Sequence, residues 1–209
     1  IKVPWYKLFM LTPVLAAMNG FSIQQNNSFL ADKLGRKLFP DFLDITDLPR
    51  EEGAYGARLF DSEGVATREL PLIEKGVLKN WYINTYIANK MGIPPTVDDA
   101  SRPVVASTVG MDCKGLAEAC RAGFAGGDKG TVLVTGFNGG NCNSATGDFS
   151  FGVEGFYHGP DGSFPVRELV MTGNMLELWN NLVAVGSDAR PCKPRVVPTL
   201  VFKDVDFSS

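Results

Sequence analysis

The sequence has little of what most metal-binding and hydrolytic sites require. It holds a single histidine, His158. No HExxH-type helix offers two imidazoles to zinc, and no nucleophile elbow supports a Ser-His-Asp triad. No CxxC pair is formed by the four cysteines, Cys113, Cys120, Cys142 and Cys192. From these absences we predict no catalytic residue, no metal ligand and no cofactor site within the chain.

Basic clusters and long apolar runs are also missing. The chain has 20 Lys and Arg against 23 Asp and Glu. Because nucleic-acid binders usually need a basic stripe to neutralise phosphates, nucleic acid is disfavoured as a partner. No apolar run approaches the roughly 18 residues that cross a bilayer, so no membrane contact is predicted. The cysteine spacing favours reduced thiols, and we expect a cytoplasmic location.

The remaining composition is that of an ordinary globular protein, with 44% hydrophobic and 21% charged residues among 209. A chain of this length buries roughly 70% of its unfolded surface, so its core needs no disulfide. The chain begins at Ile1, and residues 4–18 contain Pro13 and lack the regions of a signal peptide. We therefore expect Ile1 to be an internal point of a longer protein.

Strand patterns dominate the sequence and come in hairpins. One hairpin is predicted from Val65–Ile73 and Val77–Ile83, with Pro71 indicating an edge strand. A second joins the alternating run after Phe149 to a return strand over 163–172. Further strands are predicted over 131–136, as a buried strand, and over 196–207. Hairpins without regular βαβ alternation predict an α+β fold with a largely antiparallel sheet.

A few helices accompany these strands. Thr12 and Asn174 are predicted N-caps, and Gly92 is a predicted helix stop. Helices are predicted over 13–20, 85–91, 112–122 and 175–185.

Three polar segments are candidates for chemistry. Gly136–Asn141 is glycine-rich, but it lacks the Lys-Ser/Thr of a P-loop, so we interpret it as a tight loop approached by another backbone. Asn143–Asp148 is predicted to be a turn, with Asp148 paired to Thr146; the alternative is a loop that shapes a peptide channel. Cys192 is interpreted as an inert small hydrophobe, or alternatively as a thiolate that completes a zinc site near a subunit boundary.

An ordered series of blocks resembles the C-terminal domain of the TldD/PmbA family, whose members are also called modulators of DNA gyrase. The T-G-D-F-S run of residues 146–150, followed by Gly155-Phe156, resembles the signature of the PmbA (TldE) branch. The similarity runs from about Ser28 to Val201. Its other blocks are residues 28–36, 60–65, 73–78, 164–166, 173–174 and 185–188.

The resemblance implies a domain organisation and a role. It marks residues 1–27 as the end of a preceding segment and 28–209 as the C-terminal domain, without the family's larger N-terminal domain. The family forms TldD/TldE heterodimers that degrade or trim unfolded peptides. TldD-like chains hold zinc on a HExxxH helix and a downstream cysteine, whereas TldE-like chains lack the histidines. Here the helix would fall near Leu15–Gln25, which has no histidine or glutamate, and Cys192 matches the cysteine.

Three functions follow as hypotheses. The first is a non-catalytic subunit that forms a dimer with a TldD-like catalytic chain or with itself, and guides an unfolded peptide. The second is an autonomous protein-binding module without peptidase activity. The third is a hydrolase that uses Cys192 or Cys142 as nucleophile, which His158 alone supports poorly.

Overall fold

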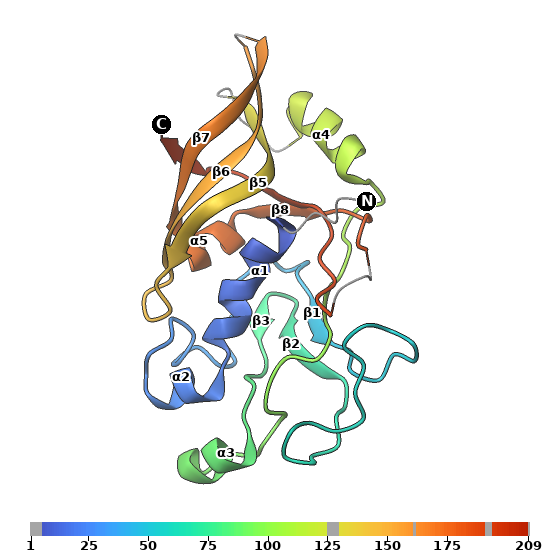
Figure 1. The fold of residues 1–209 in the computed structure, drawn as a ribbon, viewed down its shortest axis with the longest axis vertical. Helices are drawn as coiled ribbons and strands as arrows, with labels where there is room; N and C mark the ends of the chain where they lie inside the picture. Colours follow the sequence, from blue (N-terminus) through green and yellow to red (C-terminus); the bar gives the residue numbers. More distant parts are fainter. Residues whose placement is uncertain (1–5, 125–129, 161, 191–193, 209) are drawn as a thin grey trace.

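The computed structural model describes residues 6–124, 130–160, 162–190 and 194–208 of the chain (Figure 1). The helices in these ranges are α1 Tyr6–Ala17, α2 Gly20–Gln24, α3 Thr85–Met91, α4 Cys113–Arg121 and α5 Met175–Asn180. The strands are β1 Ile45–Asp47, β2 Leu70–Glu74, β3 Val77–Leu78, β4 Pro103–Val105, β5 Thr131–Cys142, β6 Asp148–Gly159, β7 Gly162–Asn174, β8 Leu182–Val185, β9 Leu200–Phe202 and β10 Asp206–Ser208.

The strands form two four-stranded sheets and one two-stranded sheet. Their orders are β3-β2-β1-β4, β10-β7-β6-β5 and β8-β9. All of the paired strands run antiparallel, which confirms the predicted α+β class. Within the described ranges, no helix is long and apolar enough to cross a membrane.

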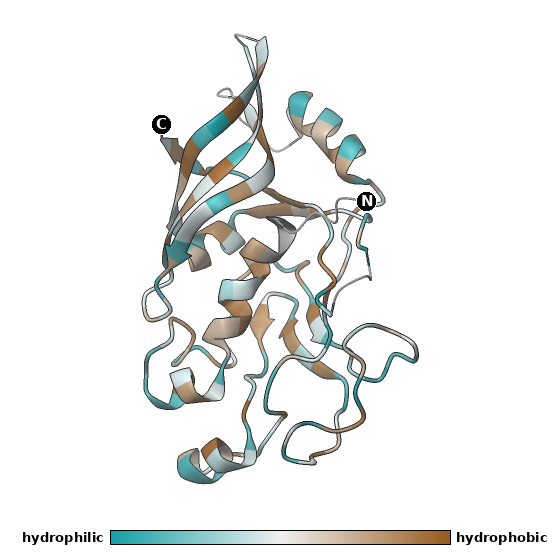
Figure 2. Ribbon diagram, viewed as in Figure 1, coloured by the Kyte–Doolittle hydropathy of each residue, from teal (hydrophilic) through white to brown (hydrophobic). Residues whose placement is uncertain are grey.

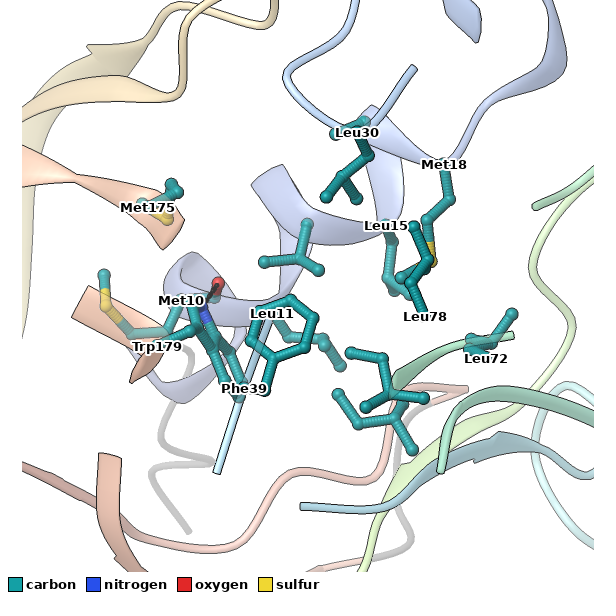
Figure 3. Packing of buried hydrophobic residues seen from close by; sticks show 14 of the residues in the cluster. Met10, Leu11, Leu15, Met18, Leu30, Phe39, Leu72, Leu78, Met175 and Trp179 are labelled. Carbon is teal, nitrogen blue, oxygen red and sulfur yellow. Dashed lines mark hydrogen bonds between the residues drawn. The ribbon is translucent and has the colours of Figure 1, made fainter. Parts of the chain in front are cut away.

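Helix α1 lies between the two large sheets and forms the centre of the core (Figure 1). Its buried side chains include Leu11, Val14 and Leu15, and Phe39 and Trp179 belong to the same cluster (Figure 3). Burying each such side chain stabilises the fold by about 1.5–3 kcal/mol. Helices α1 and α2, which precede Ser28, therefore share one hydrophobic core with the rest of the chain.

The start of α1 was predicted wrongly. The sequence indicated Thr12 as an N-cap and Pro13 as the first helical residue, but the helix begins at Tyr6 and contains Pro13. A proline inside a helix loses one backbone hydrogen bond and is usually a breaker. Here both turns around it are held by burial, because Met10 and Leu11 before it and Val14 after it are at most 7% exposed.

The first hairpin is confirmed, although its strands are shorter than predicted. Gly76 has φ +74°, and a Cβ there would overlap the Phe39 carbonyl oxygen, so this turn requires glycine. The edge-strand prediction from Pro71 is wrong, because β2 lies between β3 and β1. Proline is tolerated there because Pro71 sits beside a register shift against β1 and before the short ladder with β3.

The middle helices are confirmed and the C-terminal elements are corrected. Asn84 and Asp112 cap α3 and α4, which end close to their predicted limits. Helix α5 begins after Asn174 as predicted but ends at Asn180, because the apolar run that follows pairs as β8 with β9. The predicted strand over 196–207 is divided into β9 and β10 by Asp204, whose φ is +51°.

The glycine-rich segment Gly136–Asn141 is strand rather than loop. It continues β5, which is half-buried at Thr131–Val134 rather than fully buried as predicted. The expected close approach of another backbone is confirmed, since a Cβ on Gly140 would overlap the Ser150 carbonyl oxygen of β6. Two register shifts interrupt the β5–β6 pairing, so the glycines absorb bulges in one long strand.

A buried carboxylate joins the β3-β2-β1-β4 sheet to two loops. Asp47, at the end of β1, is 1% exposed and accepts hydrogen bonds from the Tyr82 hydroxyl at 3.0 Å and the Ser101 and Arg102 amides at 2.8 and 2.5 Å. Burial, followed by the Asp47 charge, raises the pKa of Tyr82 well above its usual value, so the phenol stays a donor.

Removing this carboxylate is expected to destabilise the fold strongly. Asp47→Ala leaves two buried amides and one hydroxyl without an acceptor, and should lower the free energy of unfolding by about 3–5 kcal/mol. Tyr82→Phe removes one donor and should cost about 1 kcal/mol. Urea unfolding of both variants tests this order, and equal costs for the two would contradict it.

Candidate functional site

Helix α1, which leads into the segment that the family resemblance links to zinc chemistry, contacts the chain just after Cys192. The segment that follows Cys192 runs beside α1, and the Arg195 guanidinium donates a hydrogen bond from Nη1 to Thr12 Oγ1 at 3.0 Å. Cys192 itself lies outside the described residues. A parallel bridge between Val104 and Val196 fixes this segment against β4. The helix and the downstream segment are therefore brought together by the fold.

Several charges act on Tyr82, including those of Asp47, Asp99 and Arg195. The positive charge of Arg195 acts to lower the pKa of Tyr82, against the larger effects of burial and of Asp47. Arg195 thus lies within electrostatic reach of the Tyr82–Asp47 pair. The groups in contact at the junction itself are the Arg195 guanidinium and the Thr12 hydroxyl.

These residues do not fit a zinc ion. Zinc sites in proteins use histidine, cysteine or carboxylate ligands, and a catalytic site takes three of them. At the junction α1 presents the hydroxyl of Thr12, and the facing side chain is a guanidinium, which repels a cation. No group of three or more His, Cys, Asp or Glu side chains with metal-binding geometry occurs in the part of the chain that the structure describes.

His158 lies in β6, one residue before the strand ends at Gly159. Its Nε2 is 2.8 Å from the Arg121 guanidinium of α4, and its Nδ1 is 2.7 Å from Ser163 Oγ on β7. Burial, followed by the Arg121 charge, lowers the pKa of His158. Both ring nitrogens join α4 to the β6–β7 hairpin, so His158 has a structural role in these contacts.

Cys142 is poorly placed to act as a nucleophile with His158. Cys142 pairs with Phe149 and Thr131 with His158, so thiol and imidazole lie at opposite ends of the β5–β6 pair, roughly 30 Å apart. Burial, followed by the Asp148 charge, raises the pKa of Cys142, so the unreactive thiol form is favoured. The hydrolase hypothesis therefore has no geometric support at this cysteine.

The predicted turn at Asn143–Asp148 is confirmed and is closely tied to its surroundings. Thr146 Oγ1 donates to Asp148 Oδ2 at 2.7 Å, and Asn174 Nδ2 donates to Asp148 Oδ1 at 2.9 Å. These hydrogen bonds, first from Asn174 and then from Thr146, lower the pKa of Asp148. The Phe29 amide donates to the Ser144 carbonyl, so the turn is anchored to the segment that follows α2.

The outer edge of β5 is a second candidate surface. β5 ends the sheet order β10-β7-β6-β5, and none of the main-chain hydrogen bonds found between described residues reaches its outer side. The register is regular over Thr131–Val134, before the first bulge. Such an edge offers unpaired N–H and C=O groups to another extended chain. The sequence did not locate this edge, because it predicted a loop over half of the strand.

Comparisons with known proteins agree with the fold and the motifs. A family model described as the PmbA/TldA metallopeptidase C-terminal domain matches residues 6–209. The metalloprotease PmbA of Escherichia coli O157:H7 is 30% identical over 178 residues, which are 84% of this chain and 38% of that protein. The PmbA homologue of Buchnera aphidicola from Acyrthosiphon pisum is 31% identical, over 83% of this chain and 37% of that protein.

Solved structures show the same arrangement. A protein named as a modulator of DNA gyrase, from Bacteroides thetaiotaomicron, is 44% identical with a TM-score of 0.89, and the match covers 99% of this chain and 45% of that one. TldE from Thermococcus kodakarensis, at 21% identity and a TM-score of 0.76 over 94% of this chain and 46% of that one, shares the fold.

The chain spans less than half the length of these relatives. The match nevertheless covers almost all of this chain and confirms the resemblance found in its motifs. The chain therefore belongs to the PmbA/TldD metallopeptidase family and corresponds to the C-terminal domain of that family.

Proposed function

We propose that this chain is a non-catalytic, TldE-like subunit of a cytoplasmic zinc metallopeptidase complex that acts on unfolded peptides. Its partner in the dimer is a TldD-like chain, which supplies the HExxxH helix and the zinc-activated water. This chain holds the partner and forms a wall along which the peptide lies.

The observation that carries this proposal is the contact between Arg195 and Thr12. The fold keeps α1, which leads into residues 15–25, beside the segment that follows Cys192. It fills the contact with a guanidinium and a hydroxyl instead of metal ligands. Residues 15–25 contain no histidine or glutamate. A scaffold without these donors supports a non-catalytic role in a complex, because hydrolysis then has to be supplied by another chain.

The β5 edge supports the peptide part of the proposal. An extended peptide that adds to a sheet edge is held through its main chain, so its sequence matters little. Unfolded peptides of many sequences all have this main chain, so one sheet edge can hold many of them. The regular stretch Thr131–Val134 is the part of β5 best suited to such pairing, since bulges interrupt the strand beyond it.

Mixing this chain with a HExxxH-bearing homologue should produce peptidase activity that neither chain shows alone. Cleavage of a fluorogenic unfolded peptide measures it. Activity should disappear when the histidines of the partner are replaced, because the zinc-activated water is lost, and should survive Cys192→Ala here.

Two outcomes would contradict the subunit proposal. If the partner cleaves equally well alone, the autonomous binding module becomes the better account. If Cys192→Ala abolishes activity while circular dichroism and gel filtration show an intact fold and complex, Cys192 takes part in the chemistry.

The isolated chain should bind no stoichiometric zinc. The junction of α1 with the 194–196 segment offers a hydroxyl and a guanidinium, and neither is a zinc ligand in proteins. Elemental analysis of protein purified without chelators measures the metal content, with the HExxxH-bearing homologue purified in parallel as the positive control. One tightly held zinc per chain would show that the donor set has been misjudged.

A further inference from the structure

A loop beside the candidate site shows large apolar side chains to solvent. Within the loop of residues 49–69, Tyr55, Leu59 and Phe60 are 66%, 67% and 64% exposed. Three such side chains within six residues exceed the scattered exposure that is normal on a protein surface. We call the segment Gly53–Phe60 the aromatic loop; it lies in the region that joins β1 to β2 (Figure 1).

The aromatic loop is held in place although its largest side chains point outward. The Arg58 guanidinium turns inward and donates to Ser101 Oγ at 2.5 Å and to Asp98 Oδ1 at 3.0 Å. Arg50 Nε donates to the Thr67 carbonyl at 2.6 Å, and the Thr67 amide donates to the Leu59 carbonyl at 3.0 Å. These hydrogen bonds stabilise the loop, so the exposed apolar side chains are not what holds it in place.

The aromatic loop borders the junction of α1 with the segment that follows Cys192. A Cβ on Gly56 would lie 2.9 Å from Pro194 Cβ and would overlap the Ser101 carbonyl oxygen. The next residue of that segment, Arg195, contacts Thr12 of α1. The loop is therefore a wall next to the candidate site, and Figure 2 shows brown, hydrophobic positions along it.

The charge around the aromatic loop is negative on balance. Residues 49–69 contain five acidic and three basic side chains. Arg58 is paired with Asp98. Among the exposed side chains of this loop that have no ion-pair partner between described residues, Glu52, Glu63 and Glu69 outnumber Arg50 and Arg68. An exposed apolar surface with excess negative charge is complementary to apolar side chains flanked by lysine or arginine.

We propose that the aromatic loop selects the substrate, by binding unfolded peptide segments in which apolar residues are flanked by lysine or arginine. This deepens the proposed function and rests on it. Main-chain pairing at a sheet edge holds any extended peptide, whereas the aromatic loop adds side-chain preference next to the junction.

Binding of three labelled peptides to the purified chain tests the proposal. Each peptide has the same length and the same two leucines in a Gly-Ser background, flanked by lysine, glutamine or glutamate. Fluorescence anisotropy at low salt should give affinities in the order lysine, glutamine, glutamate, with about fivefold between the extremes for exposed pairs. The difference should shrink as salt is raised, because exposed charges are screened.

Variants separate the apolar from the charged contribution. The triple variant Tyr55→Ser, Leu59→Ser, Phe60→Ser should weaken binding of all three peptides about tenfold while leaving the melting temperature nearly unchanged, because these side chains are exposed. Glu52→Gln with Glu69→Gln should reduce the lysine preference and leave the glutamine peptide unaffected. Phe21→Ser with Tyr86→Ser is the matched control, at 49% and 61% exposed on α2 and α3, and should change nothing.

The outcomes distinguish this inference from the function on which it rests. Binding that is unaffected by the aromatic-loop variants, an equal loss in the control, or no binding of any peptide would overturn the selection proposal. Peptidase activity with the HExxxH-bearing partner would still stand in each of those cases. Conversely, a lysine preference that depends on the aromatic loop, without activity in the mixture, would retain peptide selection and refute the subunit role.

Discussion

The packing of α1 between the two large sheets is the contact on which the rest of the structure depends. Trp179 of α5 donates from Nε1 to the Met10 carbonyl, and the Tyr82 amide donates to the Met18 carbonyl just after the helix. The ring of Phe9 stacks on Phe137 of β5 with centroids 4.7 Å apart. One helix thus contacts both sheets and the C-terminal segment, so its position sets where Thr12 meets Arg195.

Local patterns with a single physical cause were predictable from the sequence. The hairpin at Gly76 and the cap at Asn174 follow from turn and capping chemistry that involves neighbours in the chain. The alternating burial of Phe149, Phe151 and Val153 follows from the period of two along a strand. These elements also carry the family motifs, so both the fold class and the family could be inferred before the structure was known.

The errors arose where contacts distant in sequence outweigh local preference. Pro13 inside α1 is tolerated because the core covers the turns on both sides of it, and no local pattern reports that burial. The glycines of β5 resemble a loop until β6 supplies the neighbouring backbone. The junction of Thr12 with Arg195 joins residues 183 positions apart, so the identity of the facing groups could not be read from either segment.

At the same junction, the requirements of the fold differ from those of a metal site. A metal site needs its ligands within about 2–2.3 Å of one point, whereas the packing of α1 needs only apolar side chains on its buried face. Side chains at the junction can therefore differ in chemistry without disturbing the core. A guanidinium at such a position stabilises the contact by a hydrogen bond and opposes a second positive charge. The scaffold then keeps its shape, and its surface chemistry, including the aromatic loop, becomes what distinguishes it.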